Sequence, residues 1–198
     1  MVRYFACLGM IVSLFSGCDG RNTPEPGRKT SVDPVNPGVG VKSGTNVETK
    51  AAVCELVAIG GSKVSGTIMF EKEGDVVHVR GQVSGLSPGS HGFHVHERGD
   101  LTDRDTGKSA GDHYNPTEKP HGRHDDQERH VGDLGNIEAN AEGIASIDLK
   151  DKIIRLDGEH SIIGRSLVIH EKADMFTQPA GDAGGRIAFG RIDAKQPE

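Results

Sequence analysis

Two histidines separated by one residue, His94 and His96, constrain the fold of this chain more than any other feature. Residues i and i+2 of a β-strand point to the same side, so residues 92–97 would present two imidazoles on one face. More metal-type side chains follow downstream, in the order His113, His121, His130, Asp133 and His170. The pattern therefore predicts a strand that carries part of a metal site, completed by residues from later segments.

The downstream residues divide into two ligand sets. Three imidazoles and one carboxylate form a complete tetrahedral set for zinc, and the chain offers them as His113, His121, His130 and Asp133. His94 and His96 supply half of a square-planar copper site, and His170 can return to complete it. Imidazole also suits a redox-active copper, because it binds both oxidation states without the reactivity of a thiolate.

Several longer phrases around these ligands resemble the copper/zinc superoxide dismutases, over nearly all of residues 51–198. The matching phrases are GFHVHERGD (92–100), SAGDHYNP (109–116), ERHVGDLGN (128–136), HSIIGRSLVIHEKAD (160–174) and TQPAGDAGGRIAFG (177–190). The match is closer to the versions typical of eukaryotes than to many bacterial forms. The resemblance implies an oxidoreductase that converts superoxide to oxygen and hydrogen peroxide.

The resemblance also implies a role for each site residue. It assigns the copper ligands to His94, His96, His113 and His170, and the zinc ligands to His113, His121, His130 and Asp133. His113 would bridge both metals, release copper on reduction, take up a proton and pass it to the nascent peroxide. Asp174 would link a copper histidine to a zinc histidine. Arg186 falls on the arginine that guides the substrate.

Short alternating segments with turn residues between them predict an all-β chain, and no long segment has helical periodicity. The predicted fold is a Greek-key β-sandwich, or flattened eight-stranded barrel, which is also the fold that the resemblance implies. Two long loops, residues 98–130 and 171–185, are expected to be functional. The expected strands cover residues 53–59, 64–71, 76–83, 92–97, 144–149, 166–170 and 186–192.

The first fifty residues are predicted to lie outside the folded domain. Residues 1–17 have the positive start and apolar run of a secretory signal, too short to span a membrane. The run ends in Leu-Phe-Ser-Gly-Cys, which resembles a bacterial lipobox with Cys18 as the lipidated residue; an ordinary cleaved signal is the alternative. Residues 18–50 are rich in Pro, Gly, Ser and Thr and predict a disordered tether. The expected location is the periplasm or another extracytoplasmic space, at a membrane.

Cys54 is the single cysteine of the predicted domain, so a disulfide within it is impossible. The chain departs here from the family, whose members usually pin the long metal loop to the barrel with one disulfide. Residues 98–112 contain no cysteine, and the partner position holds Phe189. An exported protein is free to form disulfides, so the difference belongs to this chain and not to its compartment.

The charge and the remaining motifs limit the possible partners. The formal net charge is −6 without a basic stripe, which argues against nucleic acid as a partner. Two alternative functions remain. A copper-delivery or metal-buffering protein built on the same domain would depend on mobile cysteine thiolates, which are not available here. A copper-only relative would lack zinc, and the intact His121, His130 and Asp133 argue against it. Arg191 stands where related chains place an interface valine, which argues against the usual homodimer although Ile163 matches the interface loop.

Overall fold

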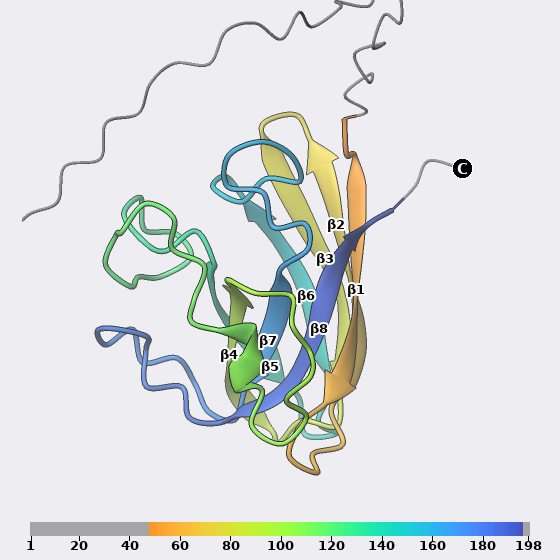
Figure 1. Cartoon of the computed structure of the whole chain (residues 1–198). Coiled ribbons are helices and arrows are strands. Elements are labelled where there is room, and N and C mark those ends of the chain that lie inside the picture. Colours follow the sequence, from red (N-terminus) through yellow and green to blue (C-terminus); the bar gives the residue numbers. More distant parts are fainter. Residues whose placement is uncertain (1–47, 196–198) are drawn as a thin grey trace, which may run out of the picture. The chain divides into compact units, whose positions relative to one another are not determined.

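Antiparallel strands close into a barrel in the computed structural model, which describes residues 48–195 (Figure 1). In this part of the chain the strands are β1 (Ala51–Ala58), β2 (Ser65–Glu73), β3 (Val76–Ser84), β4 (Gly89–His96), β5 (Asp133–Ala139), β6 (Ala145–Asp151), β7 (Ser166–His170) and β8 (Arg186–Ala194). They follow one another around the barrel as β1-β2-β3-β6-β5-β4-β7-β8, and β8 pairs with β1. The connections β3 to β4 and β6 to β7 each cross to a non-adjacent strand, as in a Greek key. The predicted all-β, eight-stranded fold is confirmed.

One strand, β5, was not among the segments expected from sequence alternation. Each of the seven expected segments overlaps an observed strand, whereas β5 follows no simple in–out pattern of burial. It begins at Asp133, a metal-type ligand, and its Gly135 has a φ of 82°, a conformation that side chains rarely adopt. A glycine and a buried carboxylate interrupt the apolar alternation on which strand prediction rests.

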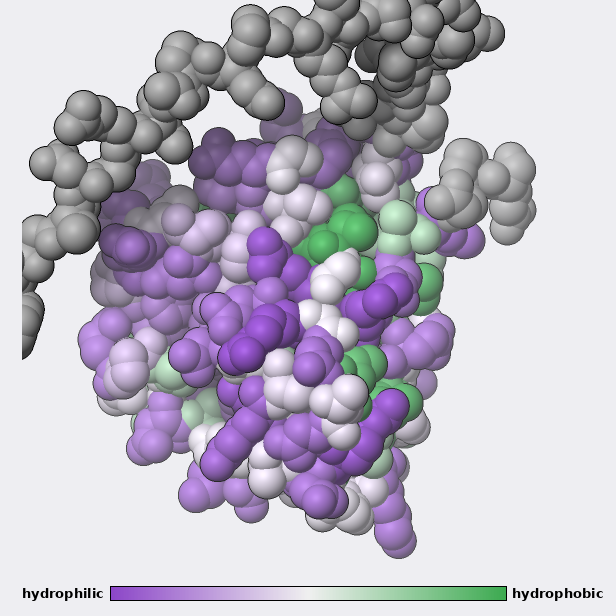
Figure 2. All heavy atoms as spheres, viewed as in Figure 1, coloured by the Kyte–Doolittle hydropathy of each residue, from purple (hydrophilic) through white to green (hydrophobic). Residues whose placement is uncertain are grey.

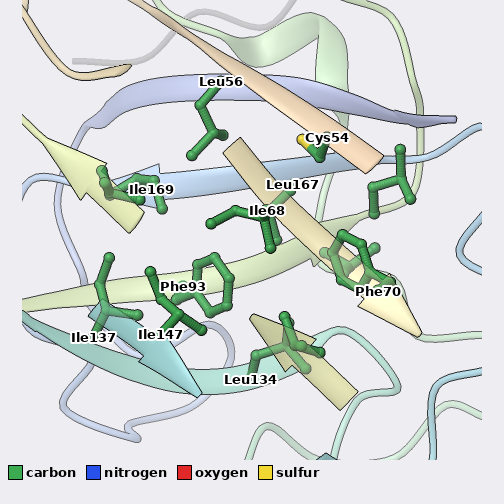
Figure 3. Packing of buried hydrophobic residues seen from close by; sticks show 14 of the residues in the cluster. Cys54, Leu56, Ile68, Phe70, Phe93, Leu134, Ile137, Ile147, Leu167 and Ile169 are labelled. Atoms are coloured by element: carbon green, nitrogen blue, oxygen red, sulfur yellow. The ribbon is translucent and has the colours of Figure 1, made fainter. Parts of the chain in front are cut away.

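The barrel interior is filled by aliphatic and aromatic side chains from every strand (Figure 3). Burial alternates along β1, where Ala52, Cys54 and Leu56 point inward. Phe70 and Ile68 of β2 are completely buried beside them. Each such side chain contributes about 1.5–3 kcal/mol by leaving water, so this core holds the strands in register.

Two neighbouring strands, β4 and β7, are buried on both faces. Every residue of β7 and the last six residues of β4 are buried. Phe93 and Val95 point into the barrel, so His94 and His96 must lie on the outer face of the sheet. Figure 1 shows the loops β4–β5 (residues 97–132) and β7–β8 (residues 171–185) on the same side of the barrel. These loops cover the histidine-bearing face.

The cysteine and the ends of the chain complete the description. Cys54 is a free thiol, and burial raises its pKa, so the thiol stays protonated. No helix within residues 48–195 is long and apolar enough to cross a membrane. The predicted signal, Cys18 and nearly all of the predicted tether lie outside the described residues.

Candidate metal centre

Two groups of buried side chains meet beneath the loops. Within each group the potential ligand atoms all lie within 4.8 Å of one another. One group contains His94, His96, His113 and His170, and the other contains His113, His121, His130 and Asp133. His113 is common to both, so the structure brings together every metal-type residue that the sequence singled out.

Strand pairing explains why residues far apart in sequence converge. His94 and His96 share the outer face of β4, and His170 ends the neighbouring strand β7. His113 is placed beside His96 by an isolated antiparallel β-bridge in the returning loop. The bridge is flanked by two backbone hydrogen bonds, from Glu97 N–H to Asp112 O and from Tyr114 N–H to Val95 O, each 2.9 Å long.

Hydrogen bonds to one ring nitrogen determine which nitrogen of a histidine remains for a metal. The carboxylate of Asp174 accepts hydrogen bonds from Nε2 of His94 at 2.9 Å and from Nε2 of His121 at 3.0 Å. The carbonyl of Gly111 accepts one from Nδ1 of His96 at 2.9 Å. Ligating histidines in proteins are commonly oriented through their second nitrogen in this way. His94 and His121 therefore offer Nδ1 to the site, and His96 offers Nε2.

The free nitrogens fit zinc and copper. Nδ1 of His94, His121 and His130 is buried without a hydrogen-bond partner, which is costly unless an ion occupies that side. Nδ1 of His121 lies 2.9 Å, and Nδ1 of His130 3.2 Å, from oxygens of Asp133. Ligand atoms around a tetrahedral zinc, with bonds of about 2.0–2.1 Å, are separated by roughly 3.3 Å. On the other side, Nε2 of His96 and Nε2 of His170 converge to 3.4 Å.

The pKa values of His96, His170, His113 and Asp133 suit metal binding. Burial alone would lower the pKa of His121, but its contacts with Asp133 and Asp174 raise that pKa to about 9. Burial, reinforced by neighbouring histidines, lowers the pKa of His96 and of His170 well below the ordinary value. Burial also lowers the pKa of His113 to about 4, against the opposing effect of Asp133. Burial alone would raise the pKa of Asp133, but the hydrogen bond with His113 and the close contacts with His121 and His130 hold that pKa below its usual range. Neutral imidazoles and an ionised carboxylate are the forms that bind metals.

A cavity of about 810 Å³ opens onto the first group of histidines. Its lining includes His96, His113, His170 and Arg186, and Arg186 is the one lysine or arginine that lines it among the described residues. The Arg186 guanidinium donates hydrogen bonds to Gly107 O at 2.6 Å and to Gly111 O at 2.5 Å. The remaining N–H donors of Arg186 have no hydrogen-bond partner within residues 48–195, so they are free to meet an anion.

Three supporting residues were not found from the sequence. Asn136 holds both sides of the Asp174 backbone, donating from Nδ2 to Asp174 O at 3.0 Å and accepting from Asp174 N–H at 2.7 Å. The Gln178 amide does the same for the His121 backbone, at 2.8 and 2.9 Å. Gly111 contributes only a carbonyl group. Asn136 and Gln178 lie inside the matching phrases, but their partners are distant in sequence and no spacing reveals them.

The fold and the site define a class of protein, a β-barrel with two potential metal-binding groups that share one histidine. Comparison with known proteins agrees with this class. The family model for copper/zinc superoxide dismutase (SODC) matches residues 64–192. The extracellular superoxide dismutase [Cu-Zn] of Brugia pahangi is 45% identical over 158 residues, which cover 75% of this chain and 78% of the relative.

Two further matches agree. The extracellular superoxide dismutase [Cu-Zn] of Caenorhabditis elegans is 47% identical over 141 residues, covering 66% of this chain and 62% of the relative. The crystal structure of the clock protein EA4 superposes with a TM-score of 0.69 at 41% identity, covering 75% of this chain and 96% of that structure. The chain belongs to the copper/zinc superoxide dismutase family. Copper and zinc are its metals, and it is an oxidoreductase.

The link that Asp174 makes between the two groups can be tested directly. Asp174→Ala removes the acceptor of both Nε2 protons, so His94 and His121 lose their fixed orientation. We expect metal affinity to fall about 10- to 100-fold, the usual effect of losing such a partner. Competition with a chromophoric chelator measures it. Asp125→Ala, whose side chain is almost fully exposed, is the control. Unchanged affinity for both metals in Asp174→Ala would contradict the assignment.

Proposed function

We propose that this chain dismutates superoxide at the double site, with His94, His96, His113 and His170 holding copper and His113, His121, His130 and Asp133 holding zinc. The single observation that carries the proposal is the membership of His113 in both ligand groups. A site for a single metal, or for copper alone, needs no histidine that is shared with a second group. It also does not need the second group's three further ligands, His121, His130 and Asp133. Superoxide is the substrate of the family to which the chain belongs.

The two metals, when bound, supply one-electron redox chemistry from copper and a fixed positive charge from zinc. The chain supplies the proton handling. Nδ1 of His113 faces Asp133 at 2.9 Å, which leaves Nε2 as the atom that can hold a proton on the cavity side. Because burial disfavours the charged imidazolium, a proton taken up at Nε2 is readily given to a bound anion. His113 and Arg186 are therefore the proposed catalytic residues.

Arg186 has to attract the substrate almost alone. After loss of a leader that contains Arg3, the chain would carry 22 Lys and Arg against 29 Asp and Glu, a net charge of −7. An anion is repelled by such a protein at long range, so a local positive group at the cavity must guide it. Asp112 and Asp182 also line the cavity, which makes the charge of Arg186 more important.

Arg186→Ala should lower the second-order rate of superoxide consumption about tenfold or more while copper and zinc stay bound. It should also weaken the decline of that rate with ionic strength, because the attracting charge is gone. Pulse-radiolysis or stopped-flow rates at several salt concentrations measure both effects. Arg191→Ala, an exposed arginine on the same strand, is the matched control. Full activity in metallated Arg186→Ala would remove Arg186 from the mechanism, and an inactive, fully metallated wild type would refute the proposed function.

We also propose that the protein acts in antioxidant defence outside the cytoplasm, attached to a membrane by lipid on Cys18. The relatives from Brugia pahangi and Caenorhabditis elegans are both described as extracellular, which supports the location. The lipobox-like sequence before Cys18 and the polar, proline-containing residues 18–50 support an anchor followed by a tether, with the catalytic domain at residues 51–198.

Cys18→Ala should release the protein from membranes or block its processing, because no acceptor for the lipid remains. Detergent partitioning and intact-mass measurement of the mature protein check this. Cys7→Ala, within the predicted leader, should leave both unchanged. A wild-type mature protein that is water-soluble and carries no lipid would contradict the anchor.

We propose that the chain does not form the homodimer usual for the family, which is the alternative. Arg191 is exposed and pairs with Asp193 on the same strand at 2.6 Å. Burying this pair at a two-fold interface would cost the desolvation of two charges per subunit. Within residues 48–195, Met175 is the one large apolar residue that is exposed, and the face in Figure 2 is mostly hydrophilic. Light scattering of residues 45–198 decides between the states; a dimer lost in Ile163→Asp would contradict the proposal.

A further inference from the structure

A small apolar cluster, separate from the barrel core, lies between the barrel and the β4–β5 loop. We name it the loop latch. Phe189 of β8 and Val168 of β7 contribute from the barrel wall, and Ile59 from the segment after β1. The loop contributes Ala110 and the partly buried Leu101. Phe189 and Ala110 are completely buried, although both lie outside the main core.

Two polar contacts reinforce the latch at its edge. The Arg104 guanidinium carbon lies 5.3 Å from the centre of the Phe189 ring, within the range of a cation–π interaction. The carbonyl of Arg104 accepts a hydrogen bond from Gly60 N–H at 3.0 Å. Phe189 therefore contacts the loop through apolar packing and through a charged side chain. Both contacts are noncovalent. The free thiol of Cys54 lies in the main core and is not part of the latch.

The loop that the latch holds also supplies the groups that orient the catalytic arginine. Arg186 donates to the carbonyls of Gly107 and Gly111, at 2.6 and 2.5 Å. The Gly111 carbonyl also accepts the hydrogen bond from His96. Gly111 directly follows Ala110, and Gly107 lies a few residues before it. A movement of the loop would therefore displace both acceptors together.

Gly107 shows how closely the loop fits between the latch and Arg186. Its φ is 69°, and an added Cβ would lie 2.8 Å from Ile59 Cδ1 and 3.3 Å from Arg186 Cδ. The loop backbone thus contacts the latch on one side and the arginine on the other. Close-packed groups transmit displacement, because they leave no free space for neighbours to absorb it.

We propose that Phe189 is a positioning residue for the dismutation reaction, which holds the β4–β5 loop so that Gly107 and Gly111 orient Arg186 toward the substrate. The inference rests on the proposed function of the same site. Removing the ring leaves a cavity between loop and barrel, which the loop can fill only by moving. A displacement of about 1 Å at a group that orients substrate can cost about 100-fold in rate.

The test compares Phe189→Ala with Phe70→Ala, which removes an equally buried ring from the main core. Mass-spectrometric amide exchange reports loop mobility in both metal-free and metal-loaded protein. We expect faster exchange in residues 98–112 of Phe189→Ala, and normal exchange there in Phe70→Ala. This readout is independent of activity.

Rates then connect the loop to Arg186. Fully metallated Phe189→Ala should lose about tenfold in rate and most of its dependence on ionic strength, as Arg186→Ala does. The double variant with Arg186→Ala should be no slower than Arg186→Ala alone, because the two residues act through one effect. Phe189→Leu, which keeps an apolar side chain, should recover most of the rate. Phe70→Ala should keep the normal rate per metallated molecule.

Leu101→Ala weakens the latch from the loop side, and it serves as the second variant if Phe189→Ala does not fold. It should change exchange and salt dependence in the same direction. Normal loop exchange with a normal rate in either variant would overturn the inference. So would a double variant about tenfold slower than Arg186→Ala alone. An inactive, fully metallated wild type would refute the proposed function instead, and the exchange data would still decide whether Phe189 holds the loop.

Discussion

The structure depends on covering the outer face of β4 and β7. This face carries His94, His96 and His170, and no part of the barrel can bury it. Buried imidazoles need a partner for each nitrogen, because an unsatisfied polar atom is costly away from water. Carbonyl and carboxylate groups of the loops accept a hydrogen bond from one nitrogen of each ring, as Asp174 does from His94 and Gly111 from His96. The second nitrogen of the ring is then left for a metal. The proposed binuclear site is thus a consequence of how a polar sheet face is buried.

Different forces hold the two sides of the site. On the proposed zinc side, Asp133 and Asp174 accept hydrogen bonds from several histidines, and Asn136 and Gln178 fix the backbones of Asp174 and His121. The proposed copper side relies on the strand pair β4–β7 and on the returning segment that carries His113. Arg186 depends in turn on carbonyl groups of a loop that is held by the apolar cluster and by backbone hydrogen bonds.

Arg186 is a positive group in a cavity with negative surroundings. The protein as a whole is negative, and two carboxylates line the same cavity as Arg186. Burial lowers the pKa of Arg186 from its ordinary value, with Asp112 and Asp103 acting in the opposite direction. An arginine retains its charge in such surroundings, where a lysine would lose a proton more easily. The choice of residue at position 186 follows from this environment.

The sequence by itself determined the ligand types, their order and the fold class. Period-two alternation identified seven strands, and the His-x-His pair placed two imidazoles on one sheet face, because side-chain direction in a strand is a local property. Strand β5 was not predicted, because Gly135 and Asp133 interrupt its apolar alternation. Only the tertiary structure decided which nitrogen each histidine presents, since Asp174 and Gly111 reach His94 and His96 across the fold. It alone showed that the loop packed against Phe189 carries the carbonyl groups that orient Arg186, because contacts between distant segments have no period that a sequence can display.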